Sequence, residues 1–220
     1  MQESQPQSQK IWPKPKRKGP PPPLNKIALN NEKHEQEKRN SKLDFLTGAF
    51  KSELLEPRLN ELINELNGLR ILEGGKRPPS NRVGFMVIFL DLDGFKEIND
   101  NFGHQAGDQA LVLFGERLYE ILKRKEIDRV YRYGGDEFVI VLPIESEKDV
   151  SDQELKALFE RKKREVNEDL FTKDGIKIEA SMGYAIFRKD DKNKTPEMII
   201  KEADDEMYIN KKDRKLNQVK

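Results

Sequence analysis

Residues 130–142 read Val-Tyr-Arg-Tyr-Gly-Gly-Asp-Glu-Phe-Val-Ile-Val-Leu, and this stretch decides the fold. Branched and aromatic residues on both sides of the glycines favour β-strands, and paired glycines supply the unusual backbone angles of a tight turn. The stretch therefore predicts a β-hairpin with strands over 130–133 and 138–142. Asp136 and Glu137 would stand at its tip.

The rest of the predicted fold is arranged around this hairpin. A continuous apolar run over 83–90 predicts a strand that is buried on both faces and ends at Asp91. Periodicity and turn residues predict the other elements: helices over 50–72 (bent or restarted by Pro57), 93–101, 106–123, 155–170 and 195–215, a loop over 73–82 and a strand over 176–187. From the buried strand onward the order βααββαβα predicts an α+β sandwich of the ferredoxin-like kind, with a mixed central sheet and helices on one or both faces.

The N-terminal part of the chain differs in composition from the rest. Residues 1–24 are mainly Gln, Ser, Pro and Lys, which predicts a disordered, basic, proline-rich tail. Residues 25–41 predict a lead-in helix or linker with little apolar face. The folded domain is expected over 42–216. The basic tail could make weak contact with a membrane surface, although a solvated linker is the simpler interpretation.

Composition excludes several classes of site. The chain has no cysteine, so disulfides and thiolate chemistry are ruled out, and any metal must bind oxygen atoms or the two histidines. No apolar run approaches the ~18 residues that cross a bilayer, and no signal peptide is evident. A cytoplasmic protein with no transmembrane segment and no specific nucleic-acid partner is expected.

Acidic residues gather at two predicted strand ends. Asp91 and Asp93 follow the buried strand, and Asp136 and Glu137 occupy the hairpin tip. Clustered carboxylates repel one another unless cations intervene, and oxygen ligands favour Mg²⁺, particularly where phosphates complete the shell. Each of these residues alone is more often a cap or a solvated group. Together they indicate nucleotide chemistry, in which two metal ions can activate a hydroxyl and stabilise a leaving pyrophosphate.

Three strings resemble the motifs of GGDEF-domain diguanylate cyclases, in the same order and spacing. Residues 131–138 are similar to the family's hallmark hairpin. Residues 91–100, followed by Phe-Gly-His at 102–104 and Gly-Asp at 107–108, resemble its nucleotide segment. Asp-Phe-Leu-Thr-Gly at 44–48 resembles its opening motif. The resemblance covers about four-fifths of the chain.

The resemblance implies a palm fold like that of nucleotide cyclases and polymerases. It also implies an enzyme of bacterial signalling: a nucleotidyltransferase that condenses two GTP into cyclic di-GMP, with each half of the product made by one domain of a homodimer. Two Mg²⁺ ions would serve as cofactors, with Mn²⁺ as an alternative.

Residue roles follow from the same resemblance. Asp91, Asp136 and the Leu92 carbonyl would be metal ligands, and Glu137 would be a further ligand or help to deprotonate the ribose 3′-hydroxyl. Asn99 and Asp108 match the positions that bind the guanine edge. Backbone amides of three residues would hold the phosphates: Gly94, Phe95 and Lys96. Two lysines on the last helix would bind them as well: Lys211 and Lys215.

The chain departs from the family pattern at three places. Lys51-Ser52 replaces the usual Asn-Arg after the opening motif. Arg214-Lys215-Leu216 replaces Gly-Arg-Asn, so a lysine stands where an arginine fork is usual, and lower triphosphate affinity is expected. The family's inhibitory product site, Arg-x-x-Asp, is degenerate here because Lys125 replaces the arginine while Asp128 is kept. Feedback inhibition is expected to be weakened or absent, although Arg124 could partly substitute.

Alternatives remain open at this point. The domain could bind GTP or cyclic di-GMP with weak or no turnover, as a receptor or interaction module. A different cyclase or polymerase-like transferase would keep the carboxylates but alter Asn99 and Asp108. The retained carboxylates favour the enzyme, because a binding module has no need of clustered charge.

Overall fold

The computed structural model describes residues 42–68, 81–122, 127–146, 150–191 and 193–218. The predicted tail over 1–24 and the predicted lead-in helix over 25–41, together with most of the predicted loop over 73–82, lie outside these residues. None of the helices within the described ranges is both long enough and apolar enough to span a membrane.

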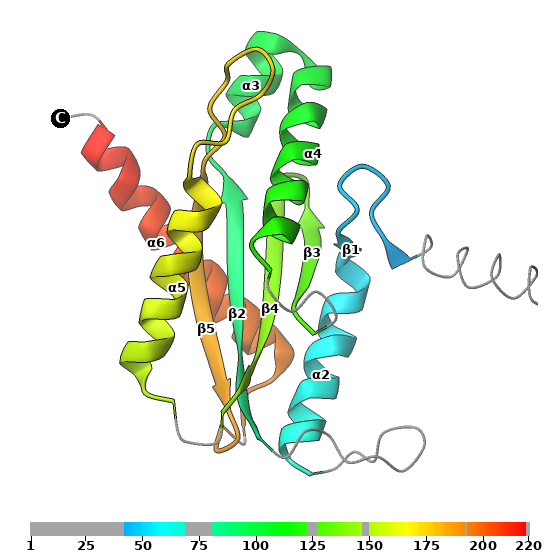
Figure 1. Ribbon diagram of the computed structural model, residues 1–220, viewed down its shortest axis with the longest axis vertical. Coiled ribbons are helices and arrows are strands. Elements are labelled where there is room, and N and C mark those ends of the chain that lie inside the picture. The colour runs from blue at the N-terminus through cyan, green and yellow to red at the C-terminus, as the bar shows by residue number, and fades with distance from the viewer. Residues whose placement is uncertain (1–41, 69–80, 123–126, 147–149, 192, 219–220) are drawn as a thin grey trace, which may run out of the picture. The chain divides into compact units, whose positions relative to one another are not determined.

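A five-stranded sheet forms the centre of the domain (Figure 1). Its strands are β1 (Phe50–Lys51), β2 (Arg82–Leu92), β3 (Arg129–Gly134), β4 (Glu137–Glu145) and β5 (Ala180–Arg188), in the spatial order β1-β3-β4-β2-β5. β1 is parallel to β3, whereas the other three pairings are antiparallel. The mixed sheet and the β2-α-β3-β4-α-β5 connection confirm the predicted ferredoxin-like α+β fold.

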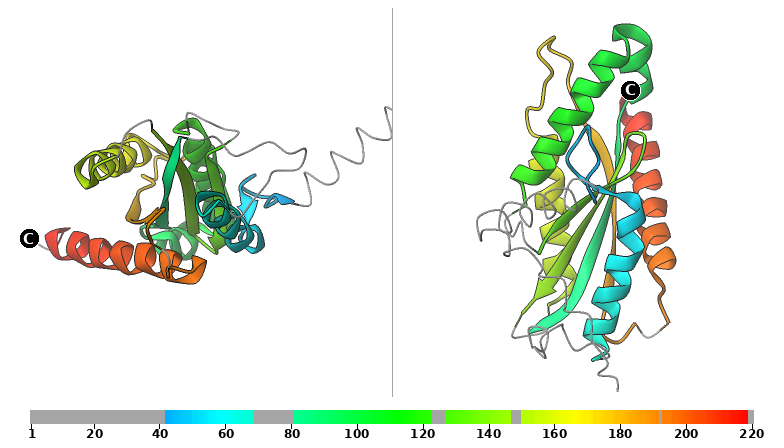
Figure 2. Two further views of the ribbon diagram at one scale, coloured as in Figure 1. Left: turned by 90° about the horizontal axis from the view of Figure 1, so that it is seen from below. Right: turned by 90° about the vertical axis from the view of Figure 1, so that its right-hand side faces the viewer.

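Helices cover both faces of this sheet. They are α2 (Leu55–Leu66, after the 3₁₀ turn η1 at Ser52–Leu54), α3 (Phe95–Phe102), α4 (His104–Glu120), α5 (Asp152–Asn167) and α6 (Pro196–Gln218). Figure 2 shows α4 and α6 on opposite sides of the sheet. One apolar core contains residues of α4 and α5, and the second contains residues of α2 and α6.

The central strand β2 contributes to both cores. Met86, Ile88 and Leu90 belong to the core with α4 and α5, while the intervening residues Phe85, Val87 and Phe89 belong to the core with α2 and α6. All six side chains are at most 2% exposed. This alternation explains why the strand reads as an unbroken apolar run, because both of its faces are removed from water.

Two predicted elements start at least four residues later than expected. The helix predicted from residue 50 begins at Leu55, because Phe50 and Lys51 pair with Tyr131 and Arg132 as a short edge strand. Pro57 lies in the first turn of α2. Proline is tolerated there, because the N–H groups of a helix's first turn have no acceptor within the helix. The strand predicted from residue 176 begins at Ala180, where pairing with β2 starts. Before that point, Lys177 forms an isolated bridge with Phe171 instead.

The free edge of β5 is bonded to side chains rather than to another strand. Asn167 accepts from the Ala180 N–H (2.7 Å) and donates to its carbonyl (3.2 Å), Asn210 donates to the Met182 carbonyl (2.9 Å), and Glu206 accepts from the Tyr184 N–H (2.6 Å). Close approach of α6 to this strand depends on Gly183, where a Cβ would lie 2.1 Å from the backbone nitrogen of Met207. These contacts fix the position of α6, which carries two cations of the site described next.

Candidate active site

The predicted carboxylates meet at one end of the sheet. The register of β2 and β4 places Asp91 directly opposite Glu137, and the Leu92 N–H donates to the Asp136 carbonyl (3.2 Å). Because Leu90 and Leu92 face the core with α4 and α5, Asp91 faces the opposite side, where α6 packs. The strand register therefore brings Asp91, Asp136 and Glu137 together as the sequence predicts.

Negative charge is crowded at this strand end. Burial raises the pKa of Asp136 above its ordinary value, and the neighbouring Asp91 carboxylate raises it further. The pKa of Glu137 is raised by burial, then by Asp91 and Asp136, and then by Asp204 of α6. Asp204 has a raised pKa of its own, from burial first and from Asp205 next. Sequence reasoning missed Asp204, because only the packing of α6 against β2 brings this carboxylate to the site.

Two cations from α6 partly compensate this charge. The ammonium group of Lys211 donates to Asp91, and Nη1 of Arg214 donates to Asp93 (2.7 Å). Nη2 of Arg214 contacts Glu179 (2.7 Å), and the Ser181 hydroxyl donates to Asp93 (2.7 Å). Each acidic residue at the end of β2 thus has a basic partner on the same helix.

The residues at this end fit a divalent cation only after a rearrangement. Within the part of the chain that the structure describes, no three His, Cys, Asp or Glu side chains already surround a common point. Burial and the neighbouring carboxylates raise the pKa of Asp136 and of Glu137, so a cation beside these side chains would be stabilising. Asp91, Asp136, Glu137 and the Leu92 carbonyl offer the oxygen donors that Mg²⁺ prefers, provided that Lys211 releases Asp91.

A cavity of about 390 Å³ opens beside the carboxylates. The first residues of α3 line it together with Asp136, Lys211 and Arg214: Gly94, Phe95, Lys96 and Glu97. The N–H groups of a helix's first turn have no partner within the helix and attract anions. The structure therefore brings the predicted phosphate-binding backbone and Lys211 into one cavity.

The predicted guanine contacts lie on two adjoining helices. Asn99 is on α3, where its amide donates to the Phe95 carbonyl (3.3 Å), and Asp108 is exposed on α4. Asn99 packs directly on Gly107, where a Cβ would lie 2.2 Å from Asn99 Oδ1. This glycine therefore sets the distance between the two helices at the residue beside Asp108.

The opening motif supports the hairpin, which sequence reasoning did not anticipate. Arg132 donates through Nε (3.1 Å) and Nη2 (2.8 Å) to the Gly135 carbonyl, and through Nη1 to Asp44 (3.0 Å). Burial alone would raise the pKa of Asp44, but hydrogen bonds from Thr47 and Arg132 outweigh it and lower that pKa. Lys51, which departs from the family pattern, lies in β1 opposite Arg132.

Three other predicted residues are not part of this cluster as described. Asp128 of the predicted inhibitory site precedes β3 and is only 6% exposed, while Lys125 lies outside the described residues. Lys215 belongs to α6, but its side chain is likewise outside the described part. The roles of these three residues remain predictions.

The fold and the carboxylates at its strand ends define a palm-like domain of the nucleotide-cyclase class. The chain belongs to the GGDEF family, because the family model described as "Diguanylate cyclase, GGDEF domain" matches residues 41–217.

Curated and solved relatives agree with this assignment. The chain is 34% identical over 139 residues to diguanylate cyclase DosC of Escherichia coli strain K12, which covers 60% of this chain but 28% of that protein. The solved sensory box/GGDEF family protein of Caulobacter crescentus CB15 has 27% identity and a TM-score of 0.62, covering 78% of this chain and 99% of that one. The coiled coil and GGDEF domain of DgcB from Caulobacter crescentus, solved with c-di-GMP, has a TM-score of 0.65 at 22% identity over 86% and 90% of the two chains.

Proposed function

We propose that this chain is a diguanylate cyclase, which joins two GTP molecules into cyclic di-GMP and releases two pyrophosphates. The observation that carries the proposal is the register that sets Asp91 opposite Glu137, with Asp136 beside them. These carboxylates adjoin a cavity that also contains the start of α3 and Lys211. Carboxylates, helix amides and a lysine around one cavity suit phosphoryl transfer to a hydroxyl.

Divalent cations would be held by Asp91, Asp136, Glu137 and the Leu92 carbonyl. When bound, two such ions supply charge for the attacking and leaving oxygens of an in-line displacement. Lys211 then has no need to neutralise Asp91, and its ammonium becomes available to the phosphates in the same cavity.

Glu137 is the residue that we assign to the proton of the ribose 3′-hydroxyl. Its carboxylate stands opposite Asp91 in the strand register, at the proposed metal site, where it can accept a proton from a hydroxyl bound there. The hydroxyl oxygen attacks the α-phosphorus of the other GTP, its proton passes to Glu137, and the bond to pyrophosphate breaks.

Guanine is selected by Asp108 and Asn99. A carboxylate accepts from the N1 and N2 protons of guanine, for which adenine has no equivalent. Asn99 approaches from α3 because Gly107 leaves room for it. ATP should therefore bind poorly.

The reaction requires two copies of the domain, because one carboxylate cluster serves one GTP. We therefore propose a homodimer in which two such sites face one another. The chain spans 28% of the DosC length, so partners supplied by other segments of such relatives lie beyond this proposal.

The test is to incubate the purified chain with GTP and Mg²⁺ at high and low protein concentration and to separate the nucleotides by chromatography. Cyclic di-GMP should form with wild type and not with Asp136→Ala, and its rate should rise more than linearly with protein concentration. Binding of GTP or cyclic di-GMP without any product would contradict the enzyme and support the receptor alternative.

A further inference from the structure

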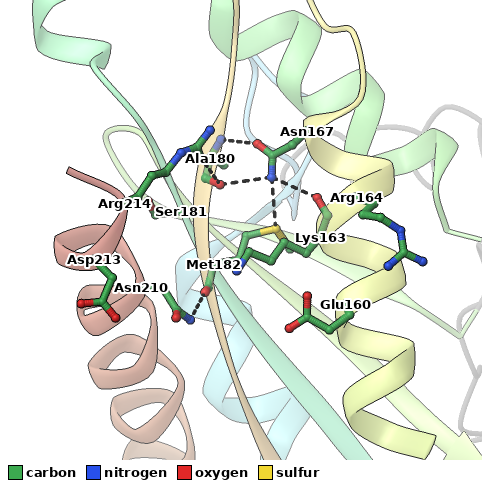
Figure 3. Close-up of a pocket in the computed structure, with 10 residues that line it drawn as sticks. All are labelled: Glu160, Lys163, Arg164, Asn167, Ala180, Ser181, Met182, Asn210, Asp213 and Arg214. Atoms are coloured by element: carbon green, nitrogen blue, oxygen red, sulfur yellow. Dashed lines mark hydrogen bonds between the residues drawn. The ribbon is translucent and has the colours of Figure 1, made fainter. Parts of the chain in front are cut away.

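Arg214 is a feature of this chain that the family pattern does not provide, because the family's Gly-Arg-Asn motif has glycine at this position. The residue lines the 390 Å³ cavity together with Lys211 and the start of α3. It also borders a second cavity of about 640 Å³ between α5, β5 and α6, where it reaches toward Ala180 (Figure 3). Arg214 thus lines both cavities.

Three acceptors hold this guanidinium in place. Nη1 donates to Asp93 (2.7 Å) and to the Ala180 carbonyl (3.4 Å), and Nη2 contacts Glu179 (2.7 Å). Glu179 also pairs with Lys177 (2.8 Å), and Asp93 also accepts from Ser181 (2.7 Å). An arginine braced in this way loses little further side-chain freedom when it binds an anion.

The braced guanidinium keeps donors for a ligand. Arginine has five N–H groups, of which three are used by these contacts. The Nε hydrogen and one Nη2 hydrogen have no acceptor among the described residues. Because the side chain lines the cavity that holds the α3 amides, these donors are available to a phosphate group there.

We infer that Arg214, rather than Lys215, is the arginine-type contact for the terminal phosphates of GTP, braced by Asp93 and Glu179. The inference rests on the proposed function, and it predicts tighter triphosphate binding than was expected from Lys215 alone. A fork that serves only the terminal phosphates distinguishes GTP from GMP, whereas a residue that merely holds α6 in place would affect both nucleotides alike.

The experiment measures binding of GTP and of GMP to the full chain by calorimetry in the presence of Mg²⁺, at a temperature where turnover is negligible. Arg214→Gln should weaken GTP about 10- to 100-fold and GMP less than threefold. Lys215→Gln should weaken GTP less than threefold. Lys212→Gln is the charge-matched control, because Lys212 is exposed on the same helix against the Tyr208 ring (4.3 Å).

A second variant tests the brace without removing the arginine. Glu179→Gln should weaken GTP by a smaller factor, about 2- to 5-fold, and leave GMP unchanged, since the guanidinium keeps Asp93. Thermal unfolding of each variant shows whether the fold is retained.

The outcomes are distinct. Equal losses for GTP and GMP in Arg214→Gln, or a larger loss in Lys215→Gln, would overturn the inference while leaving the cyclase proposal intact. If wild type binds no GTP, the proposed function fails and the inference fails with it.

Discussion

Each end of strand β2 has a group of ion pairs. At one end Arg82 pairs with Glu65 and Glu145. At the other end Asp91 pairs with Lys211, and Asp93 pairs with Arg214. The first group is buried, with Arg82 and Glu65 side chains 8% and 6% exposed. The second is more open, with Lys211 and Arg214 24% and 31% exposed. Both ends therefore contain ion pairs, but in different surroundings.

The two groups of ion pairs have different roles. At the Arg82 end, the guanidinium of Arg82 in β2 bonds to Glu65 of α2 and to Glu145 of β4. A change of partners there would leave a buried charge unpaired, which is costly. At the Asp91 end, the cations sit on long side chains of a single helix, and Asp136 and Glu137 still have raised pKa values. The first group stabilises the fold, and in the second Lys211 can leave Asp91 when a ligand binds.

The largest expected effect is a loss of activity when the Asp91 end of β2 is altered. Asp91→Asn should lower cyclic di-GMP formation by at least about a thousandfold, because it removes a carboxylate from the proposed metal site. The melting temperature should change little, since Lys211 is partly exposed. Product formation and thermal unfolding are measured on the same preparation. A variant that unfolds, rather than merely losing activity, would contradict the division between the two ends.

The next largest expected effect is a loss of stability when the buried Arg82 end of β2 is altered. Arg82→Gln should destabilise the domain by about 3 kcal/mol, because it takes the guanidinium away from two carboxylates in a buried setting. Chemical denaturation gives the free energy of unfolding. Lys201→Gln serves as the control, since the Lys201–Asp205 pair has side chains 72% and 60% exposed and should contribute little to stability. Similar losses in both variants would show that the Arg82 group has no special structural role.

The smallest effect concerns pH. The folded-state pKa of Asp136 is raised, so its ionised form destabilises the metal-free fold, and stability falls as pH rises through that pKa. Asp136→Asn should therefore stabilise the metal-free domain above the raised pKa, by less than about 1 kcal/mol because the group is partly solvated. Thermal unfolding from pH 3 to pH 8 should show the difference growing with pH.

Asp44→Asn provides the opposite sign. The folded-state pKa of Asp44 is lowered, so its ionised form contributes stability above the unfolded pKa, which is lost as pH falls through the folded value. Asp44→Asn should therefore destabilise at neutral pH. If Asp136→Asn and Asp44→Asn change stability in the same direction, the opposite pKa shifts of the two carboxylates do not determine their contributions to stability.

Much of the fold could be predicted because its signals are local. The apolar run of β2 and the glycine turn of the hairpin depend on residues adjacent in sequence, and both elements are present. The carboxylate cluster followed from them, since strand ends bring Asp91 and Glu137 together. The short strand β1 could not be predicted, because only its pairing with β3 distinguishes it from the start of a helix.

The contacts that support the site were also beyond sequence reasoning. Arg132 reaches Asp44 across 88 positions, and Arg214 reaches Asp93 across 121. Such partners are chosen by tertiary packing, and no periodicity in the sequence encodes them. Asp204 and Glu179 were missed for the same reason, as ordinary acidic residues that become relevant only through their neighbours.

The side chains along the outer edge of β5 affect how readily this protein aggregates at high concentration. An unprotected edge strand is a template on which a second chain can extend the sheet, and repeated addition leads to fibres. Here Asn167, Asn210 and Glu206 occupy the backbone groups that such an addition would need. Replacing them with alanine should leave a domain that still folds but aggregates on concentration, so these three residues act as gatekeepers against polymerisation.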